Sequence, residues 1–168
     1  SPIFLKEGGI ILIDVLKRIF MMSLEQGLFP TIWKQANVIP IHKKDSISIV
    51  NNYRPISLLY VASKLFERIA FKYVFNFFKD NFIINNYWSG FQSGRSSVTQ
   101  LLELYHQFCA AVDNQQEIRV IFLDIKRAFD KVWHKGILHK LSMCGIDGNL
   151  LEWFKSYLSE RVQRVVIN

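Results

Sequence analysis

The sequence contains few of the residues that define disulfide-rich, collagen-like or low-complexity proteins. Among its 168 residues are 2 cysteines, 4 prolines and 8 glycines. Cys109 and Cys144 lie far apart and show no Cys-x-x-Cys spacing, so we expect no disulfide framework and take a reducing compartment as the natural setting. The small numbers of proline and glycine exclude a collagen-like or low-complexity chain.

The sequence also lacks an apolar run long enough to cross a bilayer. The most apolar early stretch, residues 9–16, already contains Asp14, whereas a membrane-spanning helix needs about 20 apolar residues. We therefore expect no membrane partner. Half of the residues are nevertheless hydrophobic and 14% are aromatic, which excludes intrinsic disorder and suits one domain, or one domain and part of another.

The sequence contains fewer acidic residues than basic ones. The chain has 14 Asp and Glu against 21 Lys and Arg, which gives a formal net charge of +7. Such an excess on a folded chain favours an anionic partner, with nucleic acid as the first candidate.

Both ends of the sequence look like internal positions of a longer protein. The chain begins at Ser1 without a signal-peptide pattern. Residues 161–168 alternate like a strand and are followed by neither a turn nor a polar tail. We interpret the sequence as a fragment.

Hydrophobic periodicity predicts helices and strands without strict alternation, which favours an α+β fold. An antiparallel hairpin is expected from two extended runs, 33–42 and 53–59, although Pro40 and Pro55 indicate edge strands. Residues 117–125 are almost continuously apolar and predict a central strand buried on both faces. Helices are expected near residues 11–24, 61–79, 96–113, 134–143 and 150–159.

Asp124 ends the apolar run and is the first candidate for chemistry. A carboxylate at the end of a buried strand needs a positive partner. Mg²⁺, which prefers carboxylate oxygen, is one solution. An ion pair with Lys126 or Arg127, or a capping role, is the other, and we favour it from the residues alone. Asp130, six residues later, is expected to be structural.

Three cations form the second candidate. The hairpin would bring Lys43 and Lys44 near Arg54. Arginine binds phosphate in bidentate geometry and lysine binds it as a compact point charge. The alternative is a solvated turn, which we prefer for the lysines alone. A third, weaker candidate is the loop 90–96, which lacks the Gly-Lys-Ser/Thr ending of a P-loop and also suits a turn before a capped helix.

Taken in order, four segments closely resemble the reverse transcriptase domain of non-LTR retrotransposons, most nearly the jockey-like elements. The resemblance runs over nearly the whole chain, and four ordered motifs are more specific than any one of them. The segments read VIPIHKKD at 38–45, NYRPISLL at 52–59, SGF at 89–91, and FLD with AFD at 122–124 and 128–130.

The resemblance implies a right-hand polymerase, of which this chain has the fingers and part of a ferredoxin-like (RRM-like) palm. The chain would be truncated before the Tyr-x-Asp-Asp hairpin and the thumb. Residues 1–168 would then be a partial domain, with fingers and early palm helices over about 1–115 and palm over about 116–168. The implied partners are an RNA template, a DNA primer, a dNTP, and the rest of the palm and thumb.

The same resemblance implies roles for residues around Asp124. Asp124 would be the first of three catalytic aspartates that hold two Mg²⁺ ions, with Mn²⁺ as an alternative, and the carbonyl of Ile125 would help to hold the triphosphate-side ion. Phe129 matches the steric gate that leaves no room for a ribonucleotide's 2′-hydroxyl.

The resemblance also implies which residues bind the nucleotide and the template. Arg54, with Lys43 or Lys44, would close on the incoming triphosphate. Backbone N–H groups near Arg127 and Ala128 would line the same phosphates. The template strand would lie near Gly90, Phe91 and Gln92.

The sequence departs from the family pattern in what it does not contain. It has neither a Gly-x-Pro-Gln-Gly loop nor a Tyr-x-Asp-Asp motif. Because one carboxylate cannot hold two metal ions in catalytic geometry, we expect these 168 residues to be inactive alone.

Two alternatives remain open. The chain could be a decayed or co-opted transposon remnant that only binds nucleic acid. An RNA-dependent RNA polymerase would share the palm aspartate, but Phe129 and the NYRPIS segment argue against it.

Overall fold

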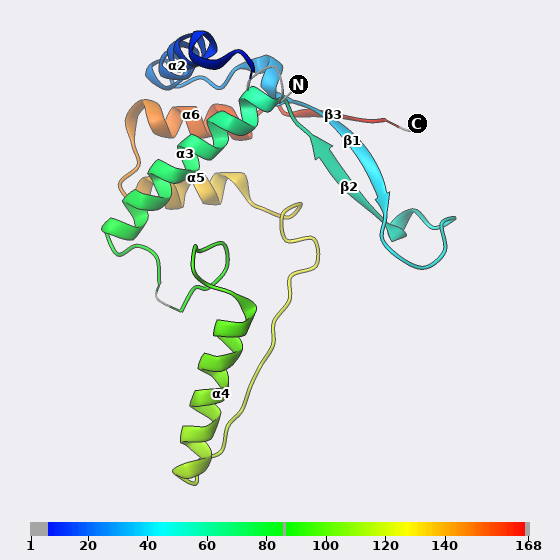
Figure 1. Cartoon of the computed structure of the whole chain (residues 1–168), viewed down its shortest axis with the longest axis vertical. Coiled ribbons are helices and arrows are strands. Elements are labelled where there is room, and N and C mark those ends of the chain that lie inside the picture. Colours follow the sequence, from blue (N-terminus) through cyan, green and yellow to red (C-terminus); the bar gives the residue numbers. More distant parts are fainter. Residues whose placement is uncertain (1–6, 86, 167–168) are drawn as a thin grey trace. The chain divides into compact units, whose positions relative to one another are not determined.

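The computed structural model describes residues 7–85 and 87–166. It is a mixed α+β structure with a small three-stranded sheet (Figure 1). The chain divides into two compact units, each of which we describe by itself. The first comprises the chain up to Phe77 together with Trp133 onward, and the second is Phe78–Val132. The expected fingers–palm boundary near residue 115 stays a prediction.

The helices confirm the expectations from hydrophobic periodicity. They are α2 (Gly9–Glu25), α3 (Val61–Asp80), α4 (Ser97–Asp113), α5 (His134–Met143) and α6 (Gly148–Leu158). Two short 3₁₀ turns, Thr31–Lys34 and Val50–Asn52, precede the strands β1 (Gln35–His42) and β2 (Tyr53–Leu58), and β3 (Val162–Val165) follows α6. Residues 167–168 of the expected final strand lie outside the described residues. No helix in the described part of the chain is long and apolar enough to span a membrane.

Local side-chain chemistry explains where α2 and α4 begin or end. Ser96 caps α4: its Oγ accepts from the Thr99 N–H at 3.2 Å, and the Thr99 Oγ1 accepts from the Ser96 N–H at 2.9 Å. Gly27 follows α2 with φ +64°, and a Cβ there would lie 3.0 Å from the Cβ of Glu152. Glycine is therefore required both for the left-handed backbone and for the close approach of α6.

An aromatic cluster forms the core of the first unit. Phe66 of α3 and Trp153 of α6 are each 1% exposed, and their ring centroids lie 5.1 Å apart. Phe20 of α2 stacks on Phe66 with centroids 4.3 Å apart. Phe29 and Trp33 complete the cluster from the segment that leads into β1. Each such aromatic pair contributes about 0.5–1.5 kcal/mol beyond the buried area, so the cluster joins helices that are distant in sequence.

Tyr157 lies at the rim of this cluster. Burial raises the pKa of its hydroxyl, the nearby Glu67 carboxylate raises it further, and Arg161 opposes the shift. The Arg161 guanidinium lies 4.7 Å from the centre of the Tyr157 ring. The Tyr157 hydroxyl therefore stays neutral at physiological pH.

The predicted hairpin is confirmed, but one prediction about its strands is wrong. β1 pairs antiparallel with β2 and parallel with β3, so it is the middle strand and not an edge strand. Pro40 is tolerated because, among the described residues, the pairing of β3 with β1 ends at Val38, so no described strand residue pairs with Pro40 on that side. Pro40 faces Pro55 across the hairpin. They form a pair at which no backbone N–H is needed for the hydrogen bonds between β1 and β2, because such pairs alternate with hydrogen-bonded ones and Lys43 and Asn52 are hydrogen-bonded.

The predicted buried strand at 117–125 is wrong. These residues are extended but belong to no strand, and Ile121, Phe122 and Leu123 are 82%, 85% and 90% exposed. In Figure 1 this segment is the long yellow trace beyond α4. Within the described chain β2 and β3 pair only with β1, and no strand forms a ladder with residues 117–125, so their backbone lacks the partner that a strand requires.

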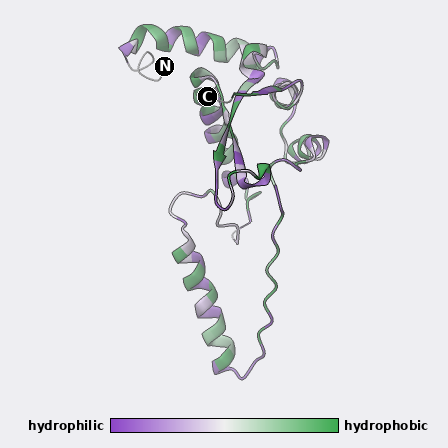
Figure 2. Cartoon of the chain, turned by 90° about the vertical axis from the view of Figure 1, so that its right-hand side faces the viewer, coloured by the Kyte–Doolittle hydropathy of each residue, from purple (hydrophilic) through white to green (hydrophobic). Residues whose placement is uncertain are grey.

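The second unit also carries exposed apolar residues on α4. Figure 2 shows hydrophobic and hydrophilic residues alternating along this helix. Leu101, Leu102 and Tyr105 are all exposed. The helix expected over residues 96–113 is therefore present, but none of its residues is buried within the described chain.

Replacing Phe66 with alanine tests the role of the aromatic cluster. We expect Phe66→Ala to lower the free energy of unfolding by about 3–5 kcal/mol, because it leaves a cavity among well-packed rings. Urea unfolding followed by circular dichroism measures the change. Tyr73→Ala is the control, since Tyr73 lies on the same helix but is 72% exposed; it should change stability by about 0.5 kcal/mol or less. Equal losses in both variants would contradict the assignment.

Candidate functional site

The hairpin gathers the three predicted phosphate-binding cations at one end. Arg54 of β2 lies opposite Ile41 of β1. Lys43 directly follows β1, and its N–H donates to the carbonyl of Asn52 at 2.8 Å. Lys44 is the next residue. None of the three cations forms an ion pair with a residue in the described chain, so their charges remain available to an anion.

Three side chains brace the turn that carries the lysines. The Tyr53 hydroxyl donates to the carbonyl of Ile47 at 2.9 Å, and the Asn52 amide donates to the carbonyl of Ser46 at 2.8 Å. His42 Nε2 lies 3.0 Å from the carbonyl oxygen of Asp45, and the His42 ring packs edge-on against Tyr53. The turn between β1 and β2 is thus held by its own side chains, which positions Lys43 and Lys44 relative to Arg54.

A second arginine shares the face of the sheet with Arg54. Arg164 of β3 lies opposite Asn37 of β1, while Arg54 lies opposite Ile41. Asn37 and Ile41 are four residues apart on one strand and therefore point to the same face. The Arg164 Nε donates to Asn37 Oδ1 at 2.7 Å. The sequence offers no motif for Arg164 or Asn37, and only the pairing of β3 with β1 reveals them.

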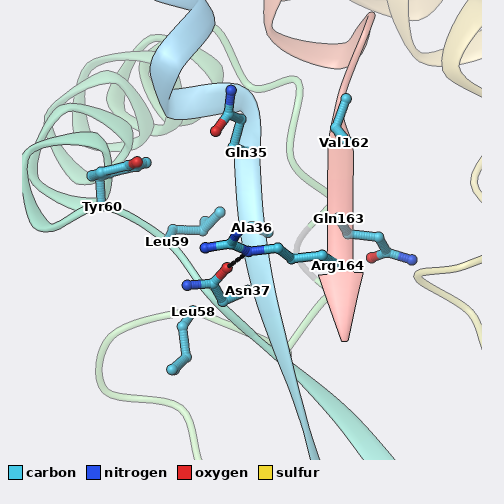
Figure 3. Close-up of a pocket in the computed structure, with 9 residues that line it drawn as sticks. All are labelled: Gln35, Ala36, Asn37, Leu58, Leu59, Tyr60, Val162, Gln163 and Arg164. Carbon is cyan, nitrogen blue, oxygen red and sulfur yellow. Dashed lines mark hydrogen bonds between the residues drawn. The ribbon is translucent and has the colours of Figure 1, made fainter. Parts of the chain in front are cut away.

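Arg164 also lines a pocket at the end of the sheet opposite the turn. The pocket measures about 330 Å³. In Figure 3 the Arg164 side chain reaches across β1 towards Asn37, whereas Gln163 points away. The lining residues are Gln35, Ala36, Asn37, Leu58, Leu59, Tyr60, Val162, Gln163 and Arg164.

The residues predicted around the catalytic aspartate lie in the second unit. Asp124 and Ile125 are exposed and belong to the irregular segment described above. A turn follows directly: Arg127 has φ +56°, and its carbonyl accepts from the N–H of Asp130 at 3.1 Å. Ala128 and Phe129 lie inside this turn, and the Phe129 side chain is 83% exposed. Asp130 therefore contributes to the turn through its backbone.

The described residues do not form a metal centre by themselves. Within 7–85 and 87–166 there is no group of three histidine, cysteine or acidic side chains that could hold an ion. The Asp124 carboxylate and the Ile125 carbonyl are oxygen donors of the kind Mg²⁺ prefers. One carboxylate is nevertheless too few for two ions.

The predicted template loop is tied to the start of α4. Ser89 hydrogen-bonds Gln100, and Arg95 forms an ion pair with Glu103. The Gln92 amide donates to the carbonyl of Trp88. Phe91 has φ +59° and an exposed ring. The loop that contains Gly90, Phe91 and Gln92 is thus braced at both ends, with Phe91 facing solvent.

Comparison with known proteins decides the family. Residues 41–168 match the family described as reverse transcriptase (RNA-dependent DNA polymerase). The chain belongs to this family. The match includes Asp124 and its turn, the loop at Gly90, and the hairpin cations Lys43, Lys44 and Arg54.

Similar proteins come from non-LTR elements of Drosophila melanogaster, which confirms the predicted resemblance to jockey-like elements. The chain is 33% identical over 144 residues to the probable RNA-directed DNA polymerase from transposon BS, covering 85% of this chain and 16% of that protein. It is 32% identical over 157 residues to the RNA-directed DNA polymerase from mobile element jockey, covering 93% and 17%. It is 34% identical over 144 residues to the probable RNA-directed DNA polymerase from transposon X-element, covering 85% and 16%. The reverse transcriptase chain thus spans about a sixth of the length of these relatives.

Removing the Tyr53 hydroxyl tests whether this side chain braces the turn that carries Lys43 and Lys44. In Tyr53→Phe we expect the backbone amides of residues 46–52 to exchange roughly fivefold faster, because one hydrogen bond contributes about 1 kcal/mol net. Hydrogen exchange followed by mass spectrometry or NMR measures this. Tyr73→Phe, on the exposed side of α3, is the matched control and should leave the turn unchanged. Unaltered exchange in Tyr53→Phe would show that the hydroxyl does not brace the turn.

Proposed function

We propose that the chain is the part of an RNA-directed DNA polymerase that binds the incoming dNTP and supplies the first catalytic aspartate. The observation that carries the proposal is the braced hairpin, which presents Lys43, Lys44 and Arg54 together and without ion-pair partners. The family match supports the polymerase reaction, for which an RNA template and a DNA primer are the remaining substrates.

The hairpin cations suit a triphosphate. Arg54 presents a planar guanidinium that can bind two phosphate oxygens, and either Lys43 or Lys44 adds a compact positive charge. Backbone N–H groups of the turn at Arg127 and Ala128 are proposed to donate to the same phosphates. In this arrangement the cations neutralise the charge that develops as the triphosphate reacts.

Asp124 is proposed as one carboxylate ligand for the two Mg²⁺ ions of the complete polymerase, with the Ile125 carbonyl beside it. Mn²⁺ is an alternative ion with the same preference for oxygen. The other ligands, together with the remainder of a right-hand palm and thumb, are proposed to come from the rest of that polymerase.

Two further assignments concern selectivity and the template. Phe129 is proposed to lie beneath the sugar of the dNTP, where its ring excludes a 2′-hydroxyl. Gly90, Phe91 and Gln92 are proposed to contact the template, since the braced loop leaves the Phe91 ring free to stack on a base.

Substituting Asp124 in the complete polymerase tests the catalytic assignment. Asp124→Asn is expected to reduce DNA synthesis by about 10³-fold or more, because a lost charge on a metal ligand costs several kcal/mol of transition-state stabilisation. Primer extension on an RNA template measures the rate. Asp113→Asn, an exposed carboxylate at the end of α4, is the control and should keep full activity. If Asp124→Asn stays within tenfold of the parent enzyme, Asp124 is not a metal ligand.

Substituting Phe129 tests whether its ring excludes ribonucleotides. Phe129→Ala should raise the kcat/KM for ribonucleotides relative to deoxyribonucleotides by about 10- to 100-fold, since relieving one steric clash is worth a few kcal/mol. Single-nucleotide incorporation by the complete polymerase measures both values. Phe82→Ala, which removes another highly exposed phenylalanine of the same unit, should leave the ratio unchanged. An unchanged ratio in Phe129→Ala would remove Phe129 from the sugar site.

A further inference from the structure

We propose that the pocket at Arg164 binds one nucleotide unit of a single-stranded nucleic acid, with the Arg164 guanidinium on a phosphate. No motif assigned this pocket, which is built by residues of all three strands and by Tyr60 just after β2 (Figure 3). The proposal rests on the proposed polymerase function only for identifying the strand as the template.

The guanidinium of Arg164 is oriented for an anion. Its Nε donates to Asn37 Oδ1 at 2.7 Å, and its two terminal nitrogens have no other partner in the described chain. β1, β2 and β3 contain no acidic residue. A guanidinium that is held at Nε keeps its terminal N–H groups free for a phosphate, and the missing acids leave its charge uncompensated.

The other lining residues suit a base and a sugar. Tyr60 is 45% exposed and offers a ring for stacking. The amides of Gln35 and Asn37 can both donate and accept hydrogen bonds. Leu58 adds apolar surface. A volume of about 330 Å³ lies at the lower end of the range of about 300–1,000 Å³ that is typical of small-ligand sites, which suits one nucleotide.

Because Arg54 and Arg164 lie on the same face of the sheet, a nucleic-acid strand is favoured over a free nucleotide as the ligand. Arg54 and Arg164 point to the same side of the sheet. Between them lies the cross-strand pair of Ile39, which is half-buried, and Ile56, which is exposed. Four residues along β1 correspond to about 13 Å. A strand of a few nucleotides therefore reaches from the pocket to the cations at the turn, with apolar surface beneath its bases.

Oligonucleotide binding by the whole chain tests the proposal. The probe is a fluorescein-labelled 12-nucleotide oligouridine RNA, titrated by anisotropy at several salt concentrations. Arg164→Gln should weaken binding about tenfold and reduce the slope of log K against log salt by about 0.7, the value for one phosphate contact on a single strand. Tyr60→Ala should weaken binding about fivefold or more through lost stacking. Arg164→Lys, which keeps the charge but not the planar fork, should fall between the parent and Arg164→Gln.

The matched control is Arg119→Gln, which removes the same charge from an exposed arginine of the other unit that is paired with Glu117. It should weaken binding less than twofold. Equal losses in Arg119→Gln and Arg164→Gln would overturn the proposal, because binding would then follow net charge alone. Competition by uridine monophosphate as effective as that by the oligonucleotide would overturn the strand assignment. Circular dichroism verifies that each variant is folded. Because the readout is binding, its failure is distinct from a failure of the Asp124 and Phe129 predictions, which concern synthesis.

Discussion

The contact of Phe66 with Trp153 is the one on which the first unit depends. Phe66 comes from α3 and Trp153 from α6, and Phe20 of α2 stacks on the Phe66 ring. These helices are far apart in sequence, and the shared rings are the apolar surface that each of them removes from water. β1 begins two residues after Trp33, another member of the cluster. The position of the sheet therefore follows from the anchoring of an aromatic side chain.

The sheet in turn explains where the unpaired charges lie. β1 follows the cluster directly in the chain and is paired with β3 over Gln35–Val38 and with β2 over Asn37–His42, so it is a rigid support for polar side chains. Arg54 and Arg164 project from one face of the sheet, and neither forms an ion pair with a residue of the described chain. The segment with Asp124 differs, because no strand in the described chain pairs with it and its apolar side chains remain exposed. The residues proposed to bind the nucleotide and the aspartate proposed to be catalytic are thus supported very differently within the described chain.

Sequence patterns predicted the local elements well. The five helices lie where they were predicted, and the two extended runs form the expected hairpin. The errors have a common cause. Pro40 indicated an edge strand, and the apolar run before Asp124 indicated a central one, yet a strand's place in a sheet depends on which other strands pair with it. Arg164 was missed for the same reason, since its importance comes from a partner strand more than a hundred residues away.

The amino-acid sequence by itself determined the helices, the hairpin and, through the order of four motifs, the reverse transcriptase family. These features depend on neighbouring residues, whose side-chain period and turn chemistry are local properties of the chain. Only the tertiary structure decided that β3 lies beside β1 and that Arg164 shares a face with Arg54. The alternation of side chains along a strand specifies two faces, but the choice of partner strand is made by long-range packing, which brings β1 and β3 together.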